Sequence, residues 1–231
     1  TRQIMKVAIC VPCRDSVMSG FCFDLAKLVG YHSRNTDDEI IILQMSGTLI
    51  FSQRETLADQ ALAEGAEAIL WIDSDMRFPA DTLEVMLSRN VPILGVNATT
   101  RREPVLPTAM QLHMGQDDTH TWEKVESRGK AGVEQVTAVG FGVTLTKADV
   151  FKTMTKPWFD ILWTAAGEVI GEDVHFCIKA QDFGIDTYVD HDLSPLIKHI
   201  GIKEYGLDDI TYGNHKLRKS TDNGSKLSGE D

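Results

Sequence analysis

The chain has 231 residues, of which 42% are hydrophobic and 25% are charged, a composition that is ordinary for a globular protein with one sizeable core. Its formal net charge of −11 argues against nucleic acid, and against an anionic membrane surface, as a main partner, because such partners attract clustered Lys and Arg. No apolar stretch reaches the roughly 18–20 residues of a membrane span, and the amino terminus lacks a signal sequence, so we expect a cytoplasmic protein without an integral membrane segment.

The first hundred residues alternate between strand and helix patterns. Apolar, β-rich runs predict strands at 7–11, 39–45, 68–72 and 91–96. Helical spacing of apolar residues predicts a helix around 21–29, and another begins near Pro79. Ser52 and Glu55 form a capping box, which predicts a further helix beginning at Ser52 and ending at Gly65. Such alternation indicates an α/β fold with an open, largely parallel sheet.

The second half is less regular. The polar stretch 97–130 predicts a long functional loop with an edge hairpin. Strands at 137–139 and 143–145 flank Gly140 and Gly142, two glycines that let the backbone pass close to a ligand or turn sharply. A helix opens at Glu172-Asp173 and precedes a strand at 185–189. We expect one domain over 1–207 and a polar, flexible tail over 208–231.

Two carboxylates follow the buried strand at 68–72. Asp73 and Asp75 are separated by Ser74, and a strand that ends in D-x-D brings both acids to the ligand-binding edge of a parallel sheet. Two ionised carboxylates with no neighbouring cation in sequence repel each other, and a divalent metal relieves that repulsion. A metal site is therefore the leading interpretation.

Several short motifs together resemble a known family. The D-x-D, the Glu172-Asp173 pair and the segment His199-Ile200-Gly201 occur in the order found in GT-A fold glycosyltransferases of the small kind known from bacteria and phages. The resemblance covers roughly residues 6–202. It implies a Rossmann-like, open mixed and mainly parallel sheet flanked by helices. It also implies an enzyme that transfers a sugar from a nucleoside diphosphate sugar, with UDP-glucose as the default donor, to an unidentified glycan, lipid or protein acceptor.

The resemblance also assigns roles. Mn²⁺ or Mg²⁺ is expected on Asp75, Asp73 and His199, with Asp75 as the more direct ligand, although a histidine at a strand end can equally be a core residue. Asp173, with Glu172 beside it, matches the acid that deprotonates the acceptor hydroxyl in inverting members. The residues that match the nucleotide-sugar site are Pro12, Cys13, Arg14, Arg54, Asp73, Ser74 and Asp75.

Physical arguments add four residues to that nucleotide-sugar site. Arg101 and Arg102 lie in the polar segment 99–107, which we expect to close as a flap on the diphosphate, and Gly140 and Gly142 allow close backbone approach. Three aromatic residues precede Glu172 and could stack on a sugar or pack in the core: Trp158, Phe159 and Trp163.

Three alternatives remain open. A haloacid-dehalogenase-type phosphatase also has D-x-D, but at the end of its first strand and with Thr or Val where this chain has Arg77. A sugar nucleotidyltransferase would need a glycine-rich loop after the first strand, which this sequence lacks. A non-catalytic module that binds nucleotide or carbohydrate is the third alternative.

Overall fold

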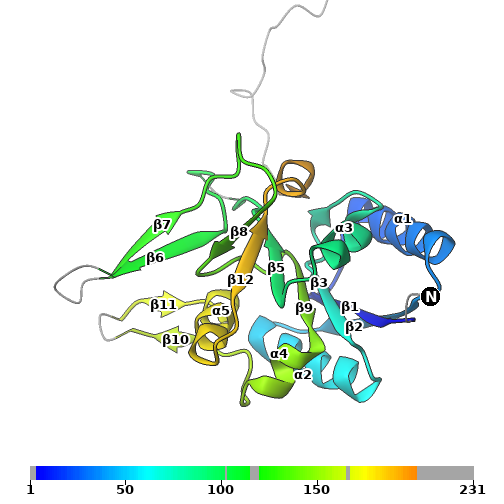
Figure 1. Ribbon diagram of the computed structural model, residues 1–231, viewed down its shortest axis with the longest axis horizontal. Coiled ribbons are helices and arrows are strands. Elements are labelled where there is room, and N and C mark those ends of the chain that lie inside the picture. The colour runs from blue at the N-terminus through cyan, green and yellow to red at the C-terminus, as the bar shows by residue number, and fades with distance from the viewer. Residues whose placement is uncertain (1–3, 102, 115–119, 165–166, 202–231) are drawn as a thin grey trace, which may run out of the picture. The chain divides into compact units, whose positions relative to one another are not determined.

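The computed structural model describes residues 4–101, 103–114, 120–164 and 167–201, so the tail predicted at 208–231 lies outside the described residues. In this part of the chain, seven strands form one mixed sheet in the order β2-β1-β3-β9-β5-β12-β8 (Figure 1). The strands are β1 (Lys6–Cys13), β2 (Glu39–Ser46), β3 (Ala68–Ile72), β5 (Ile93–Val96), β8 (Val133–Val136), β9 (Val143–Lys147) and β12 (Thr187–Asp190). Only β9 and β8 run antiparallel to their neighbours in this described sheet. The predicted mixed, mainly parallel α/β fold is confirmed.

Helices cover both faces of the sheet. One face packs on α2 (Ile50–Ala63), α4 (Ala148–Thr153) and α5 (Glu172–Asp182), because their buried residues share one hydrophobic cluster with alternate strand residues such as Ile69 and Trp71. The other face packs on α1 (Ser19–Asn35) and α3 (Thr82–Arg89), with Leu70 and Ile72 in their cluster. A strand buried on both faces reads as a continuous apolar run, as β3 does.

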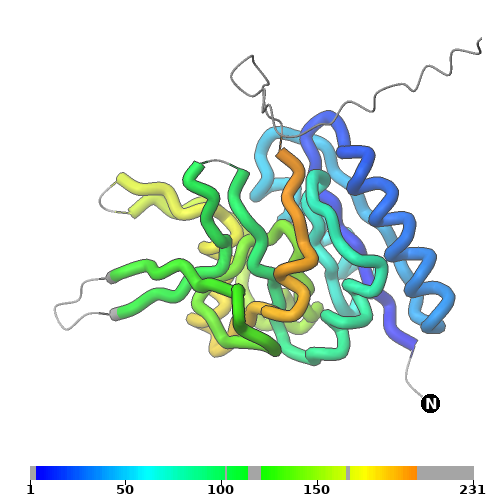
Figure 2. Tube along the Cα trace, turned by 90° about the horizontal axis from the view of Figure 1, so that it is seen from above, coloured from blue at the N-terminus to red at the C-terminus, as the bar shows by residue number. Residues whose placement is uncertain are grey.

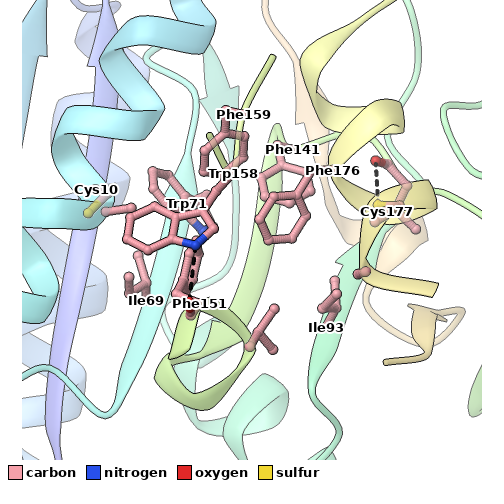
Figure 3. Packing of buried hydrophobic residues seen from close by; sticks show 14 of the residues in the cluster. Cys10, Ile69, Trp71, Ile93, Phe141, Phe151, Trp158, Phe159, Phe176 and Cys177 are labelled. Atoms are coloured by element: carbon pink, nitrogen blue, oxygen red, sulfur yellow. Dashed lines mark hydrogen bonds between the residues drawn. The ribbon is translucent and has the colours of Figure 1, made fainter. Parts of the chain in front are cut away.

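An aromatic cluster fills the first of these faces. Trp71 packs edge-on against Phe159 with ring centroids 5.2 Å apart, and Phe159 stacks on Phe176 at 4.6 Å (Figure 3). Phe141, from the loop between β8 and β9, contacts Phe176 at 5.1 Å. This packing fixes the β8–β9 loop and the start of α5 against the end of β3, where the D-x-D begins.

Three two-stranded sheets accompany the seven-stranded sheet in the described ranges. The predicted edge hairpin is present as β6 (Met110–Met114) and β7 (His120–Lys124), and a second hairpin consists of β10 (Leu162–Trp163) and β11 (Val169–Ile170). Both hairpins project from the same end of the sheet (Figures 1 and 2). A third pair joins β4 (Met76–Arg77) to β13 (Lys198–His199), which follows the 3-10 helix η1 (Ser194–Leu196).

Two local predictions were wrong. The helix α2 begins at Ile50 after Leu49, so Ser52 lies inside it, and Glu55 accepts the backbone N–H groups of Trp158 and Phe159 at 2.8 and 2.9 Å instead of closing a capping box. The strand predicted at 137–139 ends earlier, because Ala138 leaves the sheet and its carbonyl accepts the N–H of Met110.

None of the helices in the described ranges has both the length and the apolar character needed to span a membrane.

Candidate active site

A cavity of about 470 Å³ opens where β1 and β3 end. We refer to it as the carboxyl-end cavity. Its lining residues are Pro12, Cys13, Arg14, Gly47, Thr48, Ile50, Gln53, Asp73, Ser74, Asp75, Arg101 and His199. Eight of the residues predicted from the sequence therefore line one cavity, which is the arrangement expected when parallel strands end at a common edge.

Four lining residues were not predicted. Gly47 and Thr48 follow β2, so the same rule about strand ends could have identified them once β2 was recognised. Ile50 and Gln53 lie in the first turn of α2, and they were missed because the predicted start of that helix, Ser52, was wrong. Gly47 also allows close packing, since a Cβ at this position would lie 3.2 Å from the Gln53 amide nitrogen.

The backbone around the D-x-D brings His199 to Asp75. β3 ends at Ile72, and the chain turns so that the N–H of Met76 donates to the carbonyl of Asp73. β13 then pairs with β4, with His199 opposite Met76, and the N–H of Ile200 donates to the carbonyl of Asp75 at 2.8 Å. His199 thereby reaches the second aspartate of the motif from a distant part of the sequence.

When the His199 ring is neutral, Asp75 and His199 face each other with one electron pair each. His199 Nδ1 lies 2.8 Å from the carbonyl oxygen of Thr99, which can only accept, so Nδ1 carries the proton. In a neutral ring Nε2 then has a lone pair, and it faces Asp75 Oδ1 at 3.3 Å. Two acceptors at this distance need a cation between them, either a proton or a metal ion. Ligands that bind one ion at right angles at about 2.1–2.3 Å lie about 3 Å apart, so the pair fits a divalent cation.

The electrostatics of this pair follow from its neighbours. Burial raises the pKa of the Asp75 carboxyl, but the hydrogen bond and charge of His199, together with Arg101, outweigh burial and hold that pKa below its ordinary value. Burial lowers the pKa of His199, but Asp75 and the Thr99 carbonyl raise it by more. In the described ranges no cluster of three or more His, Cys, Asp or Glu side chains forms a metal cage, so a cation here would need ligands from solvent or substrate.

Arg101 reaches Asp75 from the segment 99–107. Its Nη1 lies 2.6 Å from Asp75 Oδ2, on the carboxylate oxygen that does not face His199. Thr99 and Pro107 pair as an isolated bridge, and the N–H of Thr100 donates to the Leu106 carbonyl at 2.9 Å, so both ends of the segment are held together. Arg102 lies outside the described residues, and the prediction for it is untested.

Arg54 occupies a different place from the one predicted. It is only 2% exposed and does not line the carboxyl-end cavity; its Nη2 lies 2.7 Å from Asp73 Oδ1 and its Nη1 2.5 Å from Glu172 Oε1. The guanidinium also lies over the Phe141 ring at 5.3 Å. Arg54 thus joins the D-x-D to the start of α5, two motifs that the sequence presents separately.

Of the two acids bound by Arg54, Glu172 is buried and Asp73 is partly buried, with 27% of its side chain exposed. Burial raises the pKa of Asp73, and the Arg54 charge lowers it only in part. Burial also raises the pKa of Glu172, again against an opposing effect of Arg54. The guanidinium therefore compensates two carboxylates that would otherwise be costly to bury.

Glu172 and Asp173 differ in burial and in their partners. Glu172 is buried against Arg54, whereas Asp173 is half-buried and its Oδ1 accepts the N–H of Val174 at 2.8 Å. Neither lines the carboxyl-end cavity directly. Asp173 is thus the acid of this pair whose carboxylate is not held in an ion pair with Arg54.

Gly140 and Gly142 serve backbone packing. The carbonyl of Gly142 accepts the N–H of Asp73 at 3.0 Å, and a Cβ on Gly142 would lie 3.2 Å from the Met76 sulfur. A Cβ on Gly140 would lie 3.0 Å from the Thr108 side chain. Neither glycine is among the lining residues, so their close contacts are with protein.

The three aromatic residues before Glu172 differ in solvent exposure. Trp158 and Phe159 are 6% and 1% exposed and belong to the core, whereas Trp163 is 65% exposed on β10. Of the three, Trp163 alone remains available to stack on a sugar.

We expect Arg54→Met to lower the free energy of unfolding by about 3–5 kcal/mol, because it leaves the buried carboxylate of Glu172 and the partly buried carboxylate of Asp73 without their cation. Urea denaturation followed by circular dichroism measures the loss. Arg128→Met is the matched control, because Arg128 is 89% exposed and pairs with Glu126 in solvent, where an ion pair contributes little to stability. Equal losses in the two variants would contradict the stabilising role of Arg54.

No protein-family model matches the chain, and a comparison with curated proteins finds no relative. Solved structures do resemble it. The structure of A197 from STIV has a TM-score of 0.52 at 16% sequence identity and covers 90% of this chain and 100% of that one. The structure of GalNAc-T7 with UDP, GalNAc and Mn²⁺ has a TM-score of 0.57 at 9% identity and covers 89% of this chain and 45% of that one. The chain therefore has a GT-A-type fold, while spanning less than half of the GalNAc-T7 chain.

Proposed function

We propose that this protein is a metal-dependent glycosyltransferase that moves a sugar from a nucleoside diphosphate sugar, with UDP-glucose as the first donor to test, to a hydroxyl acceptor. The observation that carries the proposal is the facing pair of Asp75 Oδ1 and His199 Nε2 in the wall of the carboxyl-end cavity, within a GT-A-type fold. The similar structure that contains UDP, GalNAc and Mn²⁺ adds support for the donor class and the metal.

The residues of the cavity suit each part of such a donor. Asp75 and His199 would hold Mn²⁺ or Mg²⁺ together with ligands from solvent and the donor, and the ion would neutralise charge on the diphosphate as the glycosidic bond breaks. Asp73, which we predicted as a further ligand, is ion-paired with Arg54. Pro12 and Cys13 end β1 and Arg14 follows it; the three residues line the part of the cavity proposed for the nucleoside. Cys13 is mostly buried, whereas the Arg14 side chain is 80% exposed and free to reorient.

Asp173 is the proposed general base of an inverting transfer. Arg54 ties the start of α5 to the end of β3, which supports a position for Asp173 beside the reacting sugar. A base must be within hydrogen-bond reach of the hydroxyl that it deprotonates, and the half-buried carboxylate of Asp173 keeps one oxygen unused by Val174.

Incubation with a panel of nucleoside diphosphate sugars tests this function. Free nucleoside diphosphate should appear with Mn²⁺ and should disappear with EDTA. Release of inorganic phosphate from a phosphomonoester would instead indicate a phosphatase, and release of pyrophosphate from a nucleoside triphosphate and a sugar phosphate would indicate a nucleotidyltransferase. Donor binding without any turnover would indicate a binding module.

We predict that the segment 99–107 becomes better protected when donor binds. Its ends are already paired through Thr99 and Pro107, so the expected change is confined to the backbone amides between them. Hydrogen exchange measured with and without UDP and Mn²⁺ should show slower exchange there, and not in β6 or β7. Equal exchange in both states would remove the segment from donor binding.

A further inference from the structure

Arg101 and a metal ion would compete for one carboxylate. The Asp75 side chain is 17% exposed and carries a single negative charge, while its two oxygens face His199 Nε2 and Arg101 Nη1. A divalent cation held by Asp75 and His199 would place three positive charges, with the guanidinium, around one negative charge. The repulsion between the two cations weakens the pairing of Arg101 with Asp75.

The structure of the segment allows Arg101 to leave Asp75 without a change at the anchored ends of the segment. Thr99 is anchored by its pairing with Pro107 and by its carbonyl, which accepts His199 Nδ1–H. The Arg101 side chain lies beyond this anchor and is 48% exposed, with its Nη1 2.6 Å from Asp75 Oδ2. Because about half of the Arg101 side chain stays in solvent, we expect this contact to exchange more readily than the buried pair of Arg54 with Glu172.

We propose that Arg101 is a placeholder cation: it neutralises Asp75 in the metal-free protein, gives up that carboxylate when the metal binds, and then pairs with the donor diphosphate. This inference rests on the proposed function and adds a regulatory step to it. Arg101 acts on the metal through Asp75, so it is a positioning residue in the free protein. The exchange makes donor capture dependent on prior metal binding.

The test is the affinity of the full chain for Mn²⁺, measured by the electron paramagnetic resonance signal of free Mn²⁺, with and without UDP. Without UDP, Arg101→Ala should bind Mn²⁺ about threefold to tenfold more tightly than the wild type, because a competing cation is gone. With UDP present, the same variant should bind Mn²⁺ about threefold to tenfold more weakly, because the diphosphate loses a partner. Arg101→Lys, which keeps the charge, should lie close to the wild type in both conditions.

Arg14→Ala is the matched control. It applies to the measurement without UDP, because Arg14 lies in the part of the cavity proposed for the nucleoside. Its ion pair is with Asp15 at 3.3 Å, so the variant removes one positive charge that does not contact Asp75. Tightening of the same size in Arg14→Ala and Arg101→Ala would overturn the inference, as would unchanged or weaker Mn²⁺ binding by Arg101→Ala without UDP. Those outcomes leave the proposed function intact. Absence of Mn²⁺ binding by the wild type, with and without UDP, would overturn both.

Discussion

Replacing Asp75 with asparagine is expected to abolish sugar transfer while the protein stays folded. The asparagine side chain has the same shape but no charge, so it cannot balance a divalent cation or hold the His199 imidazole as an ion pair. Because Asp75 contributes its charge to the wall of the cavity and not to the core, the circular dichroism spectrum should remain that of the wild type. Calorimetric titration with UDP in the presence of Mn²⁺ measures the accompanying loss of metal-dependent UDP affinity.

Two companion variants make this result specific. Asp15→Asn removes the same charge from a side chain that is 85% exposed and does not line the cavity, and it should leave the titration unchanged. His199→Ala removes one ligand of several, so a loss of roughly tenfold to a hundredfold in metal affinity is expected. Unaltered metal-dependent UDP affinity in Asp75→Asn would exclude Asp75 as a ligand.

The residues around this site could be predicted from the sequence to the extent that they depend on local rules. The end of β3 is recognisable as an apolar run that stops at two acids, and parallel strands share one edge, so residues after β1 and β3 were expected to meet. Gly47 and Thr48 follow the same rule after β2. These local rules do not place His199, because the pairing of β13 with β4 is what brings it to Asp75.

Arg54 shows why other parts could not be predicted. In sequence it is an arginine in the first turns of a helix, and most arginines are solvated. Its partners Asp73 and Glu172 are 19 and 118 residues away, and no local pattern indicates that the three side chains form ion pairs with one another. The start of α2 was predicted wrongly for a related reason. The Glu55 carboxylate accepts the N–H groups of Trp158 and Phe159, so a tertiary contact overrides the local capping pattern.

Asp173→Asn is expected to lower the rate of transfer by about a hundredfold or more while donor affinity stays close to that of the wild type, as loss of a general base does. The substitution suits this purpose, because the asparagine Oδ1 can still accept the N–H of Val174 and α5 should begin as before. Single-turnover transfer and the UDP titration, measured on the same sample, separate the two effects.

The neighbouring acid provides the contrast that decides between a base and a structural role. Glu172→Gln removes a charge that Arg54 binds in a buried pair, so it should lower the urea midpoint, whereas Asp173→Asn should not. A base on the face opposite the leaving group inverts the anomeric configuration, which proton NMR of the product reports. Retained configuration would reject the inverting mechanism, and full activity in Asp173→Asn would reject Asp173 as the base, because an amide cannot accept the hydroxyl proton at neutral pH.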